Sequence, residues 1–212
     1  MMAGALRVAT LAVLFAAVAS PAAADWQFTP FFGWTFKGST TLNDLEDASR
    51  LTHWDFGGAV TFTGRGPLGL EGYFVYTPHF FNHEENRPPG SSPNFGVKGS
   101  RTYALMGNVV LTAPKKWNEY GLRPYVSGGL GVLHASQTCC DPPGEPLSYS
   151  RTMPAYNIGG GAVGLFTDRT GIRFDLRYIG NLKDVDEDPA VAPIGRLHLR
   201  YWTTSIGVVL RY

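Results

Sequence analysis

LHLRYWTTSIGVVLRY, residues Leu197 to Tyr212, is the stretch that decides the fold. From Trp202 onward every second residue is compatible with a lipid environment: Trp202, Thr204, Ile206, Val208, Leu210 and Tyr212. The residues between them are small, polar or charged, with Val209 as the one exception. Successive side chains of a strand point to opposite faces. The segment therefore predicts a strand with one apolar face and one polar face.

The N-terminus predicts export from the cytoplasm. Arg7 precedes an apolar run of about ten residues, and small residues around Ala22 and Ala24 follow it, which is the pattern of a secretory signal peptide. The run is shorter than the ~20 residues that a membrane-spanning helix needs. We expect residues 1–24 to be a signal peptide and residues 25–212 to be one mature domain.

The composition narrows the class of protein further. Without Arg7 the chain carries 17 basic and 17 acidic residues, so it has no basic field with which to bind nucleic acid. Only 17% of its residues are charged, below the ~25% typical of a soluble domain. A low charge content with alternating hydropathy fits an exported protein that meets lipid.

Alternation with a period of two, interrupted by turn residues, predicts eight strands. They cover residues 26–37, 52–63, 70–81, 101–112, 123–136, 152–166, 172–182 and 197–212. The first, third, fifth and seventh connections are long and polar, and the second and sixth are tight turns. Long connections at one end and short ones at the other are typical of membrane barrels. The expected fold is all-β, an eight-stranded antiparallel up-and-down transmembrane barrel with both termini at the short-turn end.

The expected faces of the strands separate a barrel from a soluble sandwich. Ile172, Phe174, Leu176 and Tyr178 share one face of the seventh strand, and Arg173, Asp175 and Arg177 share the other. In the third strand the same alternation places Phe80 on the apolar face and His79 on the polar face. The sixth strand, with Gly159, Gly160 and Gly161, could not be assigned. Bulky apolar faces that end in aromatic residues favour contact with lipid over a sandwich core.

Several motifs resemble the small eight-stranded outer-membrane barrels of the OmpA-like and OmpX-like family. They are Thr29-Pro-Phe-Phe-Gly33, Leu70-Glu-Gly-Tyr73, Met106-Gly-Asn-Val109, Arg123-Pro-Tyr-Val126 with Gly128-Gly-Leu-Gly-Val132, and Val209-Leu-Arg-Tyr212. The resemblance implies a Gram-negative outer membrane, extracellular loops and periplasmic termini, with Tyr212 as the C-terminal insertion signal. It also implies assembly by the barrel-assembly machinery, and membrane lipids and lipopolysaccharide as partners. We expect a monomer and no cofactor.

The charged residues expected inside the barrel are the first candidate site. They are Asp55, Glu71, Arg173, Asp175, Arg177 and Arg211. An eight-stranded barrel is just wide enough for side chains to fill it. Opposite charges should therefore pair, because an unpaired buried ion costs several kcal/mol. A plug of ion pairs is the favoured interpretation, and a narrow pore or a small-solute site is the alternative.

His134 and Ser136 are a second, weaker candidate site. Both are expected to face lipid near the loop end of the fifth strand, where an acyl-ester hydrolase would need a base and a nucleophile. The lipid A deacylases are small barrels with a His-x-Ser pair followed by Asn, but Gln137 follows Ser136 here, and no acid is clearly placed to orient His134. Two polar residues at a strand end are the simpler interpretation.

Four arginines predict a site for lipid phosphates. Arg50, Arg101, Arg151 and Arg196 lie at or just before the start of an even-numbered strand, so we expect them at one membrane level. Guanidinium groups bind phosphate bidentately. Snorkelling of the side chains to the interface is the simpler alternative.

Two further groups of residues favour no dedicated site. His79, His83, Glu84 and Glu85 and the acidic residues between 184 and 188 lack the spacing of zinc or calcium sites, so we expect no metal. Cys139 and Cys140 are adjacent, and a vicinal disulfide, an intermolecular bridge and free thiols all stay open.

Taken together, these patterns predict a protein that is not an enzyme. We expect a role in membrane integrity or in surface contacts through four loops. A narrow, porin-like pore or a solute binder is the alternative, and a lipid A-modifying acyl hydrolase is the third interpretation.

Overall fold

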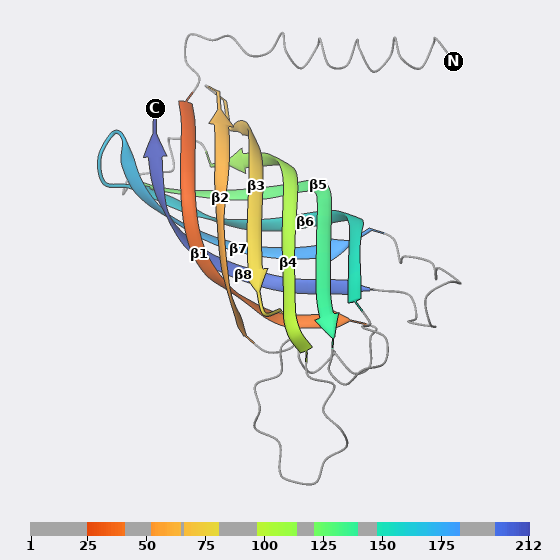
Figure 1. Cartoon of the computed structure of the whole chain (residues 1–212). Helices are drawn as coiled ribbons and strands as arrows, with labels where there is room; N and C mark the ends of the chain where they lie inside the picture. The colour runs from red at the N-terminus through yellow and green to blue at the C-terminus, as the bar shows by residue number, and fades with distance from the viewer. Residues whose placement is uncertain are drawn as a thin grey trace, which may run out of the picture.

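The eight expected strands close into one antiparallel barrel. The structure, a computed structural model, describes residues 25–40, 52–64, 66–80, 97–113, 121–139, 148–182 and 198–212. The strands are β1 (Asp25–Thr40), β2 (His53–Thr63), β3 (Leu68–Pro78), β4 (Val97–Thr112), β5 (Leu122–Cys139), β6 (Ser148–Leu165), β7 (Thr170–Asn181) and β8 (Leu199–Arg211). Each strand pairs with its neighbours in the sequence, and β8 pairs with β1 (Figure 1). No helix in this part of the chain is long and apolar enough to cross a membrane.

Four strands, β1, β4, β5 and β6, extend further at the loop end than the sequence pattern predicts. β4 begins at Val97 rather than at Arg101, and the β5–β6 ladder continues to the pair Thr138–Ser148. These added residues are mostly polar, so their hydropathy resembles that of a loop. Backbone hydrogen bonding continues along the hairpin regardless of side-chain polarity, because each residue supplies its own N–H and C=O groups.

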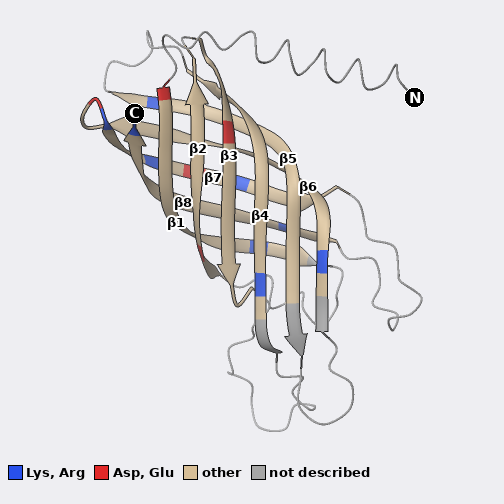
Figure 2. Ribbon diagram, turned by 45° about the horizontal axis from the view of Figure 1, so that its top comes forward, with Lys and Arg blue, Asp and Glu red and all other residues tan. Residues whose placement is uncertain are grey.

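Many large apolar side chains of the barrel point outward and are exposed. Leu130 and Ile158 are each 62% exposed, whereas Asp55 and Arg177 are fully buried inside. Figure 2 shows how few charged residues the strands carry. A soluble protein buries its apolar face instead, so this arrangement is that of a transmembrane barrel.

An arginine at Leu130 provides a direct test of this outer face. The substitution Leu130→Arg is expected to lower the free energy of unfolding by about 2–4 kcal/mol, because it places a charge in hydrocarbon. Urea titration of the protein in phospholipid vesicles measures the change. Leu130→Met keeps the site apolar and serves as the matched control. Equal stability of the two variants would mean that Leu130 does not contact lipid.

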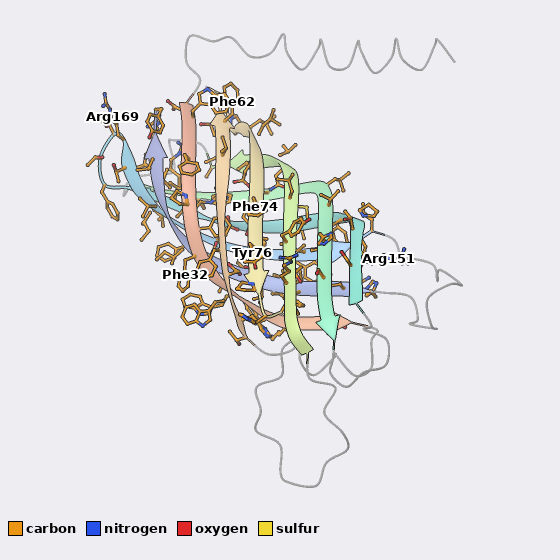
Figure 3. All side chains as sticks on the ribbon, in the orientation of Figure 1. Phe32, Phe62, Phe74, Tyr76, Arg151 and Arg169 are labelled. Atoms are coloured by element: carbon orange, nitrogen blue, oxygen red, sulfur yellow. The ribbon has the colours of Figure 1, made fainter. Side chains whose placement is uncertain are left out.

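Two groups of aromatic rings mark the membrane boundaries on the outer wall. Each strand contributes at least one outward ring near its loop end, and the set includes Trp34, Trp54, Tyr76, Tyr103, His134, Tyr156, Tyr178 and Trp202. We call this set the loop-end girdle. At the turn end Trp26 contacts Phe62 with ring centroids 5.0 Å apart, and Tyr212 is exposed (Figure 3). The ten residue steps from Trp202 to Tyr212 span roughly 25 Å along the axis of a tilted barrel, which is the height of the apolar band in such proteins.

The expected faces of β3 are wrong at its end. Phe80 is buried inside the barrel, where its ring lies 5.2 Å from that of Tyr201, and His79 is exposed. The strand stops at Pro78, and His79 adopts a left-handed backbone conformation with a φ of 56°. This turn breaks the alternation of side chains, so Phe80 points inward instead of towards lipid.

Candidate functional site

Four charged residues form a closed ionic network in the lumen. Arg173 contacts Glu71 and Asp175, each at 2.7 Å, and Arg177 contacts the same two carboxylates, each at 2.8 Å. We call Glu71, Arg173, Asp175 and Arg177 the ionic layer. All four are at least nine-tenths buried, and two positive charges balance two negative charges. The layer joins β3 to β7 across the interior of the barrel.

Polar and aromatic neighbours complete the ionic layer. Glu71 accepts hydrogen bonds from Asn108 at 3.0 Å and from Thr61 at 3.2 Å. The Arg173 guanidinium donates to the Tyr125 hydroxyl at 2.7 Å, and that hydroxyl donates to Asp175. The Arg177 guanidinium also lies 4.0 Å from the centre of the Tyr73 ring. Arg177 Nη1 has no hydrogen-bond partner among the described residues. The many other hydrogen bonds and ion pairs of the layer are what allow its charges to remain buried at low dielectric.

The glycines of β6 make room for the ionic layer and settle the facing of that strand. Gly159 pairs with Arg177 and Gly161 pairs with Asp175, both on the inner face. A Cβ atom at Gly159 would lie 2.7 Å from Arg177 Cγ, and one at Gly161 would lie 2.7 Å from the Tyr125 hydroxyl. Side chains at these two positions would displace the network. The inward face of β6 is thus the one that carries Met153, Ala155 and Asn157.

Two of the expected lumen residues lie apart from the ionic layer. Asp55 is buried and accepts a hydrogen bond from Thr203 at 2.6 Å, and its Oδ1 has no hydrogen-bond partner among the described residues. Arg211 pairs with Asp25 at the turn end, where both side chains are partly exposed. Asp55 and Arg211 therefore have surroundings quite different from those of the four central charges.

An apolar cluster fills the lumen between the ionic layer and the loop end, and the sequence analysis missed it. Its members include Val75, Ala104, Met106, Leu133, Met153, Ala155, Ile179 and Leu199, all at most 2% exposed. We call this cluster the apolar plug. The sequence does contain a pattern that indicates this cluster. Near the loop end of β4 to β7, both the inward and the outward faces carry apolar residues.

The turn end of the lumen holds a small pocket. Its volume is about 30 Å³, and its lining includes Gln27, Thr61, Arg123, Tyr125 and Arg173. A water molecule needs at least about 10–15 Å³ of such space. The pocket therefore has room for one or two waters, and it ends at the ionic layer.

The structure places His134 and Ser136 on the outer wall, but it does not join them. His134 Nδ1 lies 2.8 Å from the Thr152 hydroxyl, and its Nε2 lies 3.4 Å from the Ser150 hydroxyl. Its ring stacks on Tyr103 at 4.6 Å. Both hydroxyls that contact the imidazole thus come from β6, and neither of these contacts is with a carboxylate. A hydrolytic dyad would instead need His134 to contact Ser136.

The two described arginines of the expected rim, Arg101 and Arg151, face opposite sides of the barrel wall. Arg101 faces outward on β4, whereas Arg151 lies on the inner side of β6, opposite the buried Ala135. Both lie inside their strands, three or four residues after the first residue. Arg200 is an outward arginine of β8 that was not among the expected site residues, although it alternates with Trp202 on the apolar face.

Several expected residues lie outside the described part of the chain. They are residues 1–24, Arg50, Arg196, Cys140, the group His83, Glu84 and Glu85, and the acidic run 184–188. Among the residues that the structure describes, no three His, Cys, Asp or Glu side chains come together in a way that could hold a metal ion.

Solved structures of bacterial outer-membrane proteins share this architecture. The match to Neisserial surface protein A covers 89% of this chain and 99% of that protein's chain, at 14% identity and a TM-score of 0.54. The match to a major outer membrane protein of Thermus thermophilus covers 90% of this chain and 100% of that protein's chain, at 12% identity and a TM-score of 0.56. The match to Ail of Yersinia pestis, solved with the heparin analogue sucrose octasulfate, covers 89% of this chain and 99% of that protein's chain. The identity is 15% and the TM-score is 0.52. At these identities the likeness concerns the fold alone.

Two further comparisons concern the sequence itself. A comparison with curated proteins found no match. The model of the outer membrane protein beta-barrel domain matches residues 9–212, nearly the whole chain. With the closed eight-stranded sheet and its apolar outer wall, this match shows that the chain belongs to the family of outer membrane protein beta-barrel domains.

Proposed function

We propose that this outer-membrane protein is not an enzyme and that it acts through its wall and its loops, in membrane integrity or in contacts at the cell surface. The filled lumen is the observation that carries the proposal. The ionic layer and the apolar plug occupy successive levels of the interior. A solute would have to break four buried ion pairs and then displace close-packed apolar side chains. The charged lumen thus supports a structural role better than a pore.

The proposal predicts an absence of steady conductance. The refolded protein in planar bilayers is expected to show no stable open state, because the ionic layer and the apolar plug seal the lumen. Single-channel recording measures this, with a general porin as the positive control. A long-lived open state of large conductance in the wild-type protein would select the pore interpretation instead.

The orientation can be tested independently of the role. We expect the connections between β1 and β2, β3 and β4, β5 and β6, and β7 and β8 to face the cell exterior, and both termini to face the periplasm. An epitope inserted within residues 84–92 should bind antibody on intact cells, and the same epitope in the turn at Thr167–Thr170 should not. The opposite labelling pattern would reverse the orientation.

The lipid A hydrolase remains the weakest candidate. Expression of this protein in a bacterial host that makes unmodified lipopolysaccharide is expected to leave the mass of lipid A unchanged. The reason is that the side-chain contacts of His134 go to Thr152 and Ser150. Mass spectrometry of extracted lipid A provides the measurement. Loss of one acyl chain that Ser136→Ala abolishes would establish the enzyme and refute the proposal.

A further inference from the structure

Asp55 is a buried charge without a counter-ion among the described residues. Its side chain is fully buried in the lumen, and its Oδ1 has no hydrogen-bond partner in the part of the chain that the structure describes. The two guanidinium groups of the ionic layer are engaged by Glu71 and Asp175, and no described cation forms an ion pair with Asp55. An isolated ionised carboxylate at low dielectric is costly, so its charge needs compensation.

Gly33 allows this carboxylate to reach across β1. Gly33 pairs with Asp55 of β2 on one side and with Ser205 of β8 on the other. A Cβ atom at Gly33 would lie 2.6 Å from Oδ1 of Asp55. Because this position has no side chain, the hydroxyl of Thr203 on β8 can donate a hydrogen bond to Oδ2 of Asp55 at 2.6 Å. Hydrogen bonds from a hydroxyl to an ionised carboxylate are typically about 2.5–2.7 Å long, so this length favours the charged form of Asp55.

Three further hydroxyl groups lie close to this carboxylate. Those of Tyr73 on β3 and Tyr201 on β8 are within electrostatic range of Asp55 and of each other. Thr77 takes the inward position of β3 beside Asp55, one step beyond the last pair of the β2–β3 ladder. All three side chains are at most 1% exposed, and their hydroxyl oxygens have no hydrogen-bond partner among the described residues. Buried polar atoms normally have partners, so these three oxygens and Oδ1 indicate a ligand that they share.

Aromatic rings enclose this group of oxygens. Towards the loop end, the ring of Phe80 lies 5.2 Å from that of Tyr201 and 5.7 Å from that of His53. Towards the ionic layer, the Tyr73 ring intervenes, with the Arg177 guanidinium 4.0 Å from its centre. A ligand held among these oxygens is therefore shielded from bulk water, which strengthens its electrostatic contacts.

We propose that Asp55 and the hydroxyls of Tyr73, Thr77 and Tyr201 bind one alkali-metal cation, Na⁺ or K⁺, inside the lumen. The donors are all oxygen atoms, which suit hard cations. One carboxylate balances one positive charge, whereas a divalent ion would leave an uncompensated charge at low dielectric. A water molecule would satisfy the hydroxyls but not the charge. The site differs from the zinc and calcium sites considered above, because neutral hydroxyls replace imidazoles and further carboxylates. The inference goes beyond the proposed function, since it gives the sealed lumen a resident ion.

The experiment measures how the folding equilibrium depends on the cation. The protein is refolded into phosphatidylcholine vesicles, and its urea unfolding is followed by tryptophan fluorescence in NaCl, KCl or choline chloride at equal concentration. Choline has the same charge but is too large for the site, so screening by salt is unchanged. A ligand that binds only the folded state stabilises it by mass action. We expect a folding equilibrium constant at least about 10-fold larger in the better-fitting alkali salt than in choline chloride.

Three variants assign the cation effect to this site. Asp55→Asn keeps the shape and the contact with Thr203 but removes the charge, so the difference between the salts should fall below about 2-fold. Tyr201→Phe keeps the ring against Phe80 and removes one hydroxyl ligand, so an intermediate difference of about 3-fold is expected. Asp25→Asn removes a partly exposed carboxylate at the turn end, and it should keep the full difference.

The outcomes that contradict the site are distinct. Equal stability of the wild-type protein in all three salts would overturn the proposal, and so would a full cation effect in folded Asp55→Asn. If that variant does not fold, an undiminished effect in Tyr201→Phe would overturn it instead. Stability that ignores the alkali cation but increases on acidification in the wild-type protein, and not in Asp55→Asn, would mean that a proton compensates the charge.

This test is separate from those of the proposed function. A conducting lumen would appear in the bilayer recordings whichever cation stabilises the fold, and surface labelling reports only the orientation. A failure of the cation site would therefore leave the sealed lumen untouched, and an open pore would not by itself remove the cation effect.

Discussion

The variant Arg177→Met is expected to lose about 3–5 kcal/mol of unfolding free energy, because removal of one partner leaves buried carboxylates without compensation. Arg177 is fully buried and contacts both Glu71 and Asp175. Methionine fills much of the same volume, so the loss reports the charge rather than a cavity. Urea unfolding in phospholipid vesicles, followed by tryptophan fluorescence, measures it.

Two variants make the result specific to the ionic layer. Arg211→Met breaks a partly exposed pair with Asp25, and it should cost at most about 1 kcal/mol, as surface pairs do. The double variant Arg177→Met/Glu71→Gln removes one charge of each sign, so its loss should fall below the sum of the two single losses by about 0.5–3 kcal/mol. Strict additivity would show that the four residues do not act as one network.

The variant Gly161→Leu is expected to prevent folding or to cost more than the ~1–3 kcal/mol typical of overpacking. A Cβ atom at this position would overlap the backbone oxygen of Phe174 and lie 2.7 Å from the Tyr125 hydroxyl. Backbone atoms of a closed barrel cannot move aside without breaking the β6–β7 ladder. Heat-modifiable migration on gels and yield of refolded protein provide the measurements.

Gly72→Leu is the matched control for this prediction. Gly72 is an exposed strand glycine of β3, and a Cβ atom there would meet no other atom within 4 Å. Its replacement should not lower the free energy of unfolding, because the new side chain meets no other atom and leucine suits the lipid-facing wall. Equal damage from both substitutions would mean that β-propensity, and not space around the ionic layer, explains the loss at Gly161.

The sequence alone determined the strand count, the class of fold and most strand faces. Alternation in β7 and β8 is a local property, since each side chain takes its face from its own backbone. The outward faces of Phe174, Leu176 and Ile206 follow directly from it. The family match and the closed sheet confirm the expected barrel. Phe80 is the exception, because one left-handed residue reverses the order of faces.

Only the tertiary structure decided which inward residues meet. Glu71 and Arg177 are 106 residues apart and make contact because eight registers, closed by the β1–β8 pairing, place them at one height. The sequence named these charges but could not divide them into the ionic layer, the separate Asp55 and the pair of Arg211 with Asp25. The glycines of β6 likewise gain meaning only from the strands beside them. Facing is set within a strand, whereas contact depends on the closure of the whole sheet.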